Sequence, residues 1–321
     1  MRSTESLAFG PVPSRRLGRS LGVNNIPPKT CSYSCVYCQL GRTSNMLVER
    51  RAFYEPAQIL AQVKRKVDEA ISRGEDVDYI TFAPDGEPTL DINLGKEISL
   101  LKGLGVPVAV ITNASLLWHE GVREDLREAD FVSLKVDAVS PSMWWRVNRP
   151  HRDLRLDVVL DGVKQFARGF KGKLVSETML IDGVDYEEEL RRIASFLKGL
   201  VGLSKAYIAV PIRPPAERWV RPAKEGVLNE AFQIFSEALG SDKVEHLIGY
   251  EGNAFAFTGN IKEDLLSITA VHPMREEAVA ELLKKAGVGW QVVDELLRDG
   301  ELVKITYEGK AYYVRRLSKT K

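Results

Sequence analysis

Apolar side chains recur at helical spacing between residues 55 and 73, and charged residues fill the positions between them. The predicted buried face of this helix consists of Leu60, Val63, Val67 and Ile71. Gly74 follows as a helix stop, and the apolar run over 76–84 is typical of a buried strand.

This helix–strand alternation continues along the chain to about residue 215. Helices are predicted near 93–103, 119–128, 156–169 and 186–200, and apolar strands follow them at 107–114, 131–138, 173–180 and 205–212. With an early strand near 17–25, the pattern predicts about six strands separated by helices. Such a pattern indicates an α/β fold with a parallel sheet or barrel, in which functional residues gather in the loops after the strands.

The pattern changes from about Ile261 onward. Residues 264–273 lead into two predicted short helices, 275–287 and 289–300, and a hairpin that turns at Glu308-Gly309 follows them. Two short helices followed by a hairpin are typical of a winged helix-turn-helix domain. We therefore predict a partial barrel over residues 1–245, a connecting segment over 246–261 and a winged-helix domain over 262–321.

The composition is that of an ordinary globular protein of 321 residues, 44% hydrophobic and 28% charged. The formal net charge is +1, so any attraction to nucleic acid or to a membrane must be local. No apolar run approaches membrane-spanning length, and the N-terminal residues lack the apolar core of a signal peptide. These features predict a cytoplasmic protein without a membrane partner, in a compartment where clustered cysteines indicate metal binding or catalysis.

All three cysteines of the chain, Cys31, Cys35 and Cys38, lie in the stretch CSYSCVYC. Three thiols are one too many for a disulfide and one too few for a closed tetrahedral metal site. A 4Fe–4S cluster on three thiolates would leave one iron open to a molecule that carries an amine and a carboxylate. The alternative is a structural zinc site completed by a histidine. The chain has four histidines, none at zinc-finger spacing: His119, His151, His246 and His272.

The CxxxCxxC spacing, with the aromatic residue Tyr37 before the last cysteine, resembles the signature of the radical S-adenosylmethionine (SAM) superfamily. The resemblance extends over about residues 8–215 and implies a partial (β/α)6 barrel with two cofactors, a 4Fe–4S cluster on the three cysteines and SAM. In that superfamily a reduced cluster passes one electron to SAM, giving methionine and a 5′-deoxyadenosyl radical that abstracts a hydrogen atom.

The stretch FAPDGEPTL, residues 82–90, resembles the GGEP motif that follows the next strand in this superfamily. The resemblance implies that Glu87 accepts hydrogen bonds from the SAM amine and that Gly86 lets the backbone approach closely. Asp85 departs from the glycine often found there, and by itself such a stretch is also a common surface turn.

Three later strand ends, TNAS, SLKVDA and SETMLIDGVD, resemble further SAM-binding segments of the superfamily. They imply a place in the SAM pocket for Asn113 and Glu177, and they place Lys135 and Asp137 near the carboxylate and ribose of SAM. The structural alternatives are a strand-end turn for the asparagine and an ordinary Lys-x-Asp pair. Many relatives carry arginine or asparagine at the position of Glu177.

No cysteine remains for a second cysteine-ligated cluster or for a methyl carrier. The stretch over residues 10–43 resembles a branch of radical SAM proteins related to wyosine-type tRNA-modifying synthases. Those synthases are expected to hold a second cluster through extra cysteines, so the resemblance does not extend to their reaction.

Two basic segments point to RNA as a substrate. Arg15, Arg16 and Arg19 precede the cysteines, and residues 143–155 mix tryptophans with arginines, namely Trp144, Trp145, Arg146, Arg149, Arg152 and Arg155. Basic residues interleaved with aromatic ones bind single-stranded nucleic acid through phosphate pairing and base stacking. The structural alternative is that the tryptophans pack under the loop while the arginines are solvated or bind SAM or acidic side chains.

The sequence therefore leaves three hypotheses open. The first is a radical SAM enzyme that modifies RNA, with an electron donor such as flavodoxin or ferredoxin. The second is a glycyl-radical-type activase or peptide-modifying enzyme, whose protein substrate docks on the winged helix. The third is a non-catalytic iron–sulfur winged-helix regulator. No residue is assigned a catalytic role beyond holding the cofactors.

Overall fold

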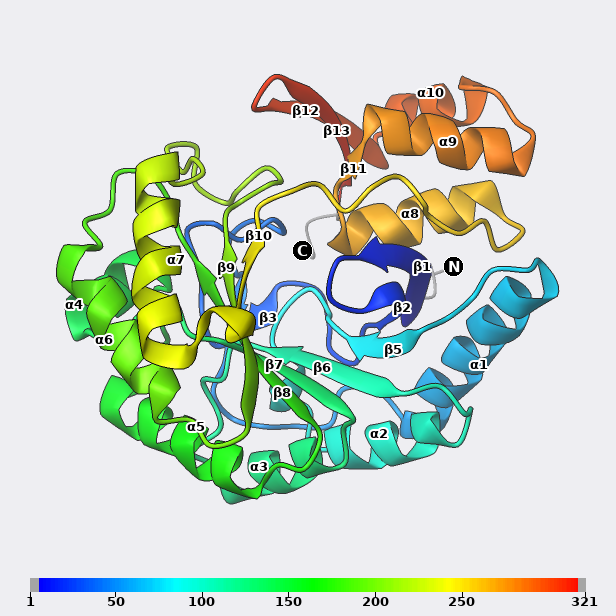
Figure 1. The fold of residues 1–321 in the computed structure, drawn as a ribbon. Coiled ribbons are helices and arrows are strands. Elements are labelled where there is room, and N and C mark those ends of the chain that lie inside the picture. The colour runs from blue at the N-terminus through cyan, green and yellow to red at the C-terminus, as the bar shows by residue number, and fades with distance from the viewer. Residues whose placement is uncertain (1–5, 317–321) are drawn as a thin grey trace.

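The structure, a computed structural model, describes residues 6–316. Its main feature is a curved sheet of eight strands with helices packed around its outer side (Figure 1). In sheet order the strands are β1 (Ala8–Ser14), β2 (Gly18–Val23), β5 (Tyr79–Phe82), β6 (Val108–Thr112), β7 (Phe131–Lys135), β8 (Lys173–Met179), β9 (Leu203–Ala209) and β10 (Val244–Leu247). Neighbours from β2 to β10 are parallel, and β1 is antiparallel to β2. The predicted α/β partial barrel is confirmed.

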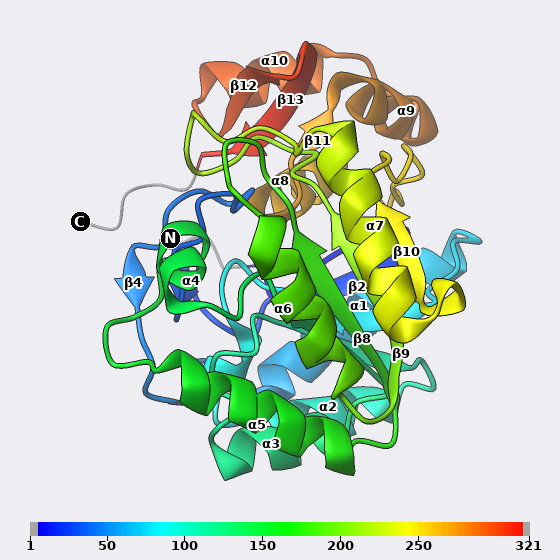
Figure 2. The ribbon, with the colours of Figure 1, turned by 60° about the vertical axis from the view of Figure 1, so that its left-hand side comes forward.

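Helices connect the parallel strands and cover the sheet from outside, as Figure 2 shows for the side of α5, α6 and α7. They are α1 (Pro56–Ser72), α2 (Leu94–Lys102), α3 (Glu120–Arg127), α4 (Pro141–Val147), α5 (Leu156–Gly169), α6 (Glu187–Lys198) and α7 (Glu225–Leu239), with a short 3₁₀ helix, η2 (Ser241–Lys243), before β10. Strands covered in this way are buried on both faces, which explains the continuous apolar runs in the sequence. The carboxyl ends of the strands carry the candidate site.

Both ends of the sheet extend beyond the predicted set of about six strands. β1 carries Pro11 and Pro13, and proline is tolerated on an edge strand because no neighbour needs its missing N–H group. β10 is short and forms the other edge, after the unpredicted helix α7. The sequence pattern therefore identified the central strands and missed the edges.

The buried face of α1 differs from the predicted one. Ile59, Val63 and Val67 are buried, whereas Ile71 is 61% exposed. The apolar stripe passes through Ala70 in the last turn, one residue before Ile71, and a step of one residue rotates a side chain by about 100° around the helix. Ile71 therefore points to solvent, and its assignment to the core was wrong.

Residues from Ile261 to 316 form a separate group of elements, here called the C-terminal unit. It contains α8 (Ile261–Val271), β11 (Met274–Arg275), α9 (Glu276–Ala286), α10 (Gln291–Arg298), β12 (Leu302–Tyr307) and β13 (Lys310–Arg315), with the strand order β11-β13-β12. The hairpin turns at Glu308 and Gly309, as predicted. Both residues have a positive φ. Residues 264–271, expected only to lead into a helix, are themselves part of α8. The winged-helix class and the domain boundaries stay predictions.

The C-terminal unit packs on the open edge of the sheet beside β1 (Figure 1). Phe9 and Val12 of β1 share one apolar cluster with Leu265 and Ile268 of α8. The unit and the edge strand therefore have a common core.

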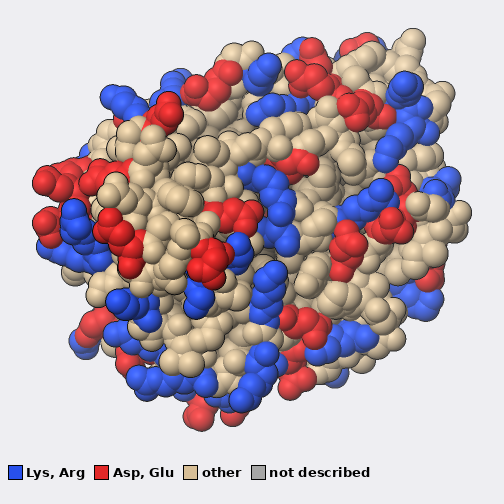
Figure 3. Space-filling view, viewed as in Figure 1, with Lys and Arg blue, Asp and Glu red and all other residues tan. Residues whose placement is uncertain are grey.

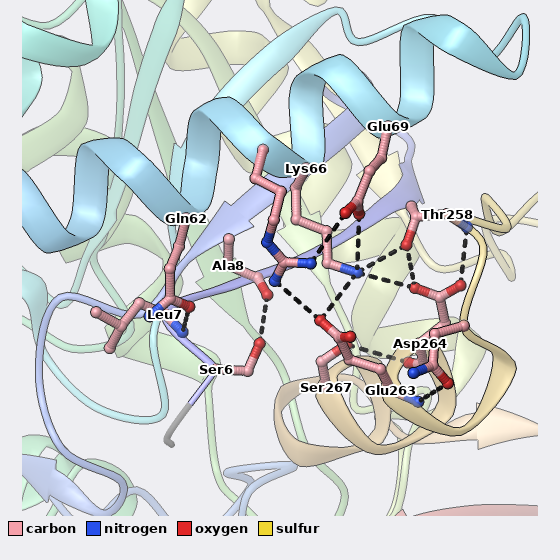
Figure 4. Close-up of polar contacts among 12 residues, drawn as sticks. Ser6, Leu7, Ala8, Gln62, Lys66, Glu69, Thr258, Glu263, Asp264 and Ser267 are labelled. Atoms are coloured by element: carbon pink, nitrogen blue, oxygen red, sulfur yellow. Dashed lines mark hydrogen bonds and ion pairs between the residues drawn. The ribbon is translucent and has the colours of Figure 1, made fainter.

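A buried ammonium group reinforces this contact (Figure 4). Lys66 of α1 is 1% exposed, and its Nζ donates hydrogen bonds to Oγ1 of Thr258 at 2.7 Å and Oδ1 of Asp264 at 3.1 Å. The backbone N–H of Thr258 donates to the other carboxylate oxygen of Asp264. A buried charge requires such partners, so this network ties α1 to α8.

Acidic and basic side chains are interspersed over the face seen in Figure 3, without an extended patch of one sign. This distribution agrees with the net charge of +1. Among the described residues, no helix combines the length and the apolar character that crossing a membrane requires.

Candidate active site

The three cysteines lie in one loop, here called the cysteine loop (residues 30–41), which follows β2 after a short connection. Cys31 belongs to the two-residue strand β3 (Thr30–Cys31), which pairs with β4 (Asn45–Met46). The backbone N–H of Cys38 donates to the carbonyl oxygen of Cys35 at 3.1 Å, so a tight turn places these two residues close together. All three thiols are free and partly exposed.

Amide groups surround the sulfur atoms. The backbone N–H of Tyr33 and the Nδ2 group of Asn113 each lie 3.5 Å from Sγ of Cys31, and Nδ2 of Asn148 lies 3.5 Å from Sγ of Cys35. Hydrogen bonds to sulfur stabilise the negative charge of cluster thiolates and adjust the cluster potential. The loop therefore fits a 4Fe–4S cluster. Burial raises the pKa of the Cys35 thiol to about 12, so metal binding must displace its proton.

A single-metal site is not supported by the geometry. Within residues 6–316, no group of three or more His, Cys, Asp or Glu side chains is arranged to hold one metal ion. Ligands of one ion must converge on a point, whereas each cysteine of a cubane cluster binds a different iron atom. The structural zinc alternative therefore gains no support.

Gly86 packs against the strand that carries the first cysteine. Thr30 and Gly86 form an isolated parallel bridge, and the N–H of Glu87 donates to the carbonyl oxygen of Thr30 at 3.1 Å. Gly86 has a φ of 153°, and a Cβ atom there would lie 1.7 Å from the Thr30 oxygen. The backbone at Gly86 thus approaches the cysteine loop closely, and its predicted part in SAM binding stays a prediction.

Glu87 is buried, and both oxygens of its carboxylate accept hydrogen bonds from protein donors. Oε1 accepts hydrogen bonds from the hydroxyl groups of Thr89 and Thr112, both at 2.6 Å, and Oε2 accepts one from the backbone N–H of Asn113 at 2.7 Å. Glu87 also caps the short 3₁₀ helix η1 (Pro88–Leu90). Burial raises the pKa of Glu87 despite these donors. In this arrangement Glu87 joins the ends of β5 and β6, and its predicted contact with the SAM amine remains a prediction.

Asp137 joins the cysteine loop to the end of β7. Its carboxylate accepts hydrogen bonds from the hydroxyl of Tyr37, from Nδ2 of Asn148 at 2.7 Å and from the backbone N–H of Met179 at 2.8 Å. Asn148 also contacts Cys35, so Asp137 helps to position both the aromatic ring and a cysteine. Asp137 is buried, and its predicted place near the ribose is untested.

Lys135 and Glu177 face one another across neighbouring strand ends. Nζ of Lys135 lies 2.9 Å from Oε1 of Glu177 and 3.3 Å from Oδ1 of Asp137, and it lies 4.8 Å from the ring centroid of Tyr37. Burial alone would lower the pKa of Lys135, but the carboxylates of Asp137 and Glu177 raise it. The lysine is therefore a fixed cation.

Arg16 also binds Glu177. Its Nη1 donates to Oε2 of Glu177 and, at 3.1 Å, to Oγ of Ser133. Burial alone would raise the pKa of Glu177, but Arg16 and Lys135 lower it to about 2. Arg16, expected to face RNA, instead turns inward to this carboxylate. No local pattern predicts this pairing because 161 positions separate the two residues.

A cavity of about 360 Å³ opens between the cysteine loop and the strand ends. Among the predicted residues, those that line it are Tyr37, Cys38, Gly86, Lys135 and Glu177. Its size is in the range of small-molecule and cofactor pockets. The structure therefore brings Cys38 and the charged strand-end residues Lys135 and Glu177 to one cavity. Asn113, Glu87 and Asp137 are not among the lining residues. Their hydrogen bonds fix the strand ends next to the cavity.

Arg213, Glu251 and His272 also line the cavity, and only His272 was named from the sequence, as one of four histidines that could complete a zinc site. Arg213 follows β9, Glu251 lies in the connecting segment and His272 ends α8. Nε2 of His272 lies 2.9 Å from both Nη2 of Arg213 and Oε1 of Glu251. These residues are far apart in sequence and belong to no local motif, so only the fold could reveal them.

The tryptophan–arginine segment is not the loop that was expected. It begins inside α4, where Trp144 is 3% exposed and donates from Nε1 to the hydroxyl of Tyr33 at 3.0 Å. Pro141 at the first position of α4 allows the helix to start there. Arg149 is bound to Glu217, and Trp145 alone of the pair is exposed, at 49%. For Trp144 the structural alternative, packing beneath this segment, therefore applies.

Comparisons with known proteins agree with this site. The family model of the radical SAM superfamily matches residues 25–197. The chain is 47% identical to the UPF0026 protein MJ1312 of Methanocaldococcus jannaschii, over 97% of each chain. The crystal structure of a radical SAM methyltransferase from Sphaerobacter thermophilus is similar, with 16% identity and a TM-score of 0.52 over 72% of this chain and 66% of that one.

The structure of TYW1 with a lysine-pyruvate adduct bound also aligns, with 10% identity and a TM-score of 0.42 over 92% of this chain and 80% of that one. This similarity is too low to carry an argument about function, and the likeness to the methyltransferase shows the fold alone. The match to the family model and the relative at 47% identity together show the family of this chain. This chain belongs to the radical SAM superfamily, whose members are enzymes that use a 4Fe–4S cluster and SAM.

Proposed function

We propose that this protein uses a single 4Fe–4S cluster to cleave SAM reductively and to abstract a hydrogen atom from an RNA substrate, in a wyosine-related branch of the superfamily. When bound, the reduced cluster supplies the electron that converts SAM to methionine and a 5′-deoxyadenosyl radical. A flavodoxin or ferredoxin of the cytoplasm is the proposed electron donor.

The observation that carries this proposal is the cavity directly beside Cys38. Cys31, Cys35 and Cys38 would hold the cluster, and Asn113 and Asn148 would donate hydrogen bonds to its thiolates. A radical must be kept from water, and a cavity lined by strand ends and loops limits its access to solvent.

The residues proposed to face SAM are those that line this cavity. Lys135 suits a carboxylate, and Glu177, which stays ionised, suits an ammonium group. Gly86 keeps the adjoining backbone close to the cysteine loop. Glu87 and Asp137 are proposed to act indirectly. Glu87 fixes the strand ends, and Asp137 fixes Tyr37.

Support for RNA comes from the surface beside α4. Trp145 is exposed, and the side chains of Arg152 and Arg155 are exposed as well. An exposed aromatic ring and exposed guanidinium groups in one segment suit base stacking and phosphate pairing, although Arg152 and Arg155 also pair with Asp153 and Asp157. The support is narrower than the sequence indicated because Trp144, Arg16 and Arg149 are engaged within the protein.

The test is release of 5′-deoxyadenosine by the anaerobically reconstituted protein, with and without tRNA. The proposal expects stimulation by tRNA, binding that weakens with salt, and loss of stimulation in Trp145→Ala. Trp118→Ala, at an exposed tryptophan before α3, is the matched control and should behave as the wild type. Substitution of any cysteine by alanine should abolish both the cluster and the product. Product formation without any tRNA effect would refute RNA as the substrate.

The two remaining hypotheses predict different results from the same preparation. An activase or peptide modifier would transfer deuterium from a labelled protein into deoxyadenosine. A regulator would keep its cluster and fail to cleave SAM with a strong reductant, and membership in an enzyme superfamily counts against that outcome.

A further inference from the structure

The end of the cysteine loop is bound by the C-terminal unit. Gln39 and Leu40 directly follow Cys38. Nε2 of Gln39 donates a hydrogen bond at 3.0 Å to the carbonyl oxygen of Val271, the last residue of α8 and 232 positions further along the chain. The side chain of Leu40 packs against the apolar cluster that α8 shares with β1. A hydrogen bond and an apolar contact therefore join the residues after Cys38 to α8 and to the core around it.

The amide oxygen of Gln39 is bound as well. It accepts a hydrogen bond at 2.9 Å from Nη1 of Arg213, which follows β9. A charged donor makes such a bond stronger than one between neutral groups. Nη2 of Arg213 contacts Glu251 and lies 2.9 Å from Nε2 of His272 at the end of α8. Gln39 thus uses both ends of its amide, and the guanidinium group that binds its oxygen is itself held by two further side chains.

The hairpin of the C-terminal unit fixes the backbone that leads into Arg213. The hydroxyl groups of Tyr307 and Tyr312 donate to the carbonyl oxygens of Pro211 and Ile212, at 3.0 and 2.8 Å. Both tyrosines are buried, and a buried hydroxyl that loses its acceptor is costly, so the fold favours keeping these bonds. The C-terminal unit therefore reaches the cysteine loop by two routes, directly from α8 and indirectly from the hairpin through the segment after β9.

Cys38 itself lies in a tight turn. Its N–H donates to the carbonyl oxygen of Cys35, and its own carbonyl oxygen accepts from the N–H of Gly41, both at 3.1 Å. The sulfur atoms of the other two cysteines are contacted by asparagine amides of the barrel, whereas the residue after Cys38 is bound by the C-terminal unit. Cys38 also lines the cavity. Groups that orient a metal ligand commonly change metal affinity by about 10–100-fold when they are removed.

We propose that the C-terminal unit, through both routes, positions Cys38 for cluster binding, with Gln39 as the positioning residue. A side chain that is bound at both ends of its amide keeps the turn at Cys38 in one orientation. The inference rests on the proposed function, because it takes the three cysteines as the cluster ligands. The C-terminal unit is then a part of the active site that acts on the cluster through the cysteine loop.

The test uses the full-length protein after anaerobic reconstitution, without SAM or tRNA. Gln39→Leu keeps the approximate size of the side chain and removes both hydrogen bonds. A chelator should remove the cluster about tenfold faster or more than from the wild type, and the electron paramagnetic resonance spectrum and midpoint potential of the reduced cluster should shift. Gln233→Leu, at an exposed glutamine of α7, is the matched control and should behave as the wild type.

The double variant Tyr307→Phe/Tyr312→Phe removes the two bonds from the hairpin and leaves the cysteine loop unchanged in sequence. Its cluster spectrum should shift in the same direction as that of Gln39→Leu, which a purely local role of Gln39 would not produce. Hydrogen exchange of the cluster-free protein gives a readout that needs no cluster. In Gln39→Leu the amides of Cys38 and Gly41 should exchange about tenfold faster, while those of the barrel helices keep the wild-type rates.

A cluster with the wild-type spectrum, potential and stability in Gln39→Leu would overturn the inference. A shift in Gln39→Leu without one in the double tyrosine variant would also overturn it, because the hairpin would then have no part in the effect. Faster exchange throughout the chain would do the same, since it reports a general loss of stability. Failure of the wild type to assemble a cluster would refute the proposed function and the inference with it, so the two failures are distinguishable.

Discussion

The α-carbon of Gly86 lies so close to the carbonyl oxygen of Thr30 that a Cβ atom would stand 1.7 Å from that oxygen. Thr30 immediately precedes Cys31, so the strand end after β5 sets the position of the first cysteine. The usual reason for glycine in such a motif is access for a ligand. Here the contact is within the protein.

Gly86→Ala should therefore displace Thr30 and abolish cluster assembly, measured as iron content and visible absorption after anaerobic reconstitution. Gly74→Ala is the matched control, since Gly74 also has positive φ but a Cβ there would meet nothing within 4 Å. It should cost about 1–2 kcal/mol of stability for the left-handed backbone and keep the cluster. Normal cluster content in Gly86→Ala would contradict this role.

Glu87→Gln should lower the free energy of unfolding by about 1–3 kcal/mol. Its oxygens accept hydrogen bonds from Thr89, Thr112 and Asn113, and an amide nitrogen would face one of these donors. The measurement is urea unfolding of the cluster-free protein, which separates stability from SAM binding. If the unfolding is unchanged while SAM binds more weakly, Glu87 contacts the cofactor directly.

Glu177→Gln should destabilise the protein in a pH-dependent manner. The pKa of Glu177 is about 2, below its ordinary value of 4.5, so its ionised form stabilises the fold above pH 4.5. This contribution is lost as the pH falls from 4.5 towards 2. The difference in unfolding free energy from wild type should therefore be largest at neutral pH and shrink in acid. Glu188→Gln, at an exposed glutamate of α6, should show no such trend.

Lys66→Met should cost about 3–5 kcal/mol, because it leaves the buried carboxylate of Asp264 without its cation. Protection from hydrogen exchange should fall in α8 in particular. The double variant Lys66→Met/Asp264→Leu should recover much of the loss. Lys64→Met is the control, since this exposed lysine pairs with Asp68 on the helix surface and should contribute less than about 0.5 kcal/mol. A similar cost for both lysines would refute the network's importance.

The central strands were predictable because parallel strands covered by helices are uniformly apolar and the helices between them are amphipathic. The edges were not. β1 contains two prolines and packs partly on the C-terminal unit, so its sequence does not show the pattern of a central strand. The exposure of Ile71 depends on how α1 is rotated about its own axis relative to the sheet. The apolar pattern alone does not determine this rotation.

The cysteine loop was predictable because its ligand spacing is local, within residues 31–38. The pairing of Arg16 with Glu177 and the group around Arg213 depend on contacts across the whole chain. The two tryptophans show the same limit of prediction from local sequence. Trp144 and Trp145 are adjacent and chemically identical, yet helical geometry buries one and exposes the other.

The shared core of β1 and α8 has a consequence for how the protein is made. Phe9 and Val12 are synthesised well before their partners Leu265 and Ile268. Domains generally form from the N-terminus during translation, but this edge strand acquires its apolar partners only after α8 has been synthesised. The nascent barrel therefore exposes an apolar edge until that point.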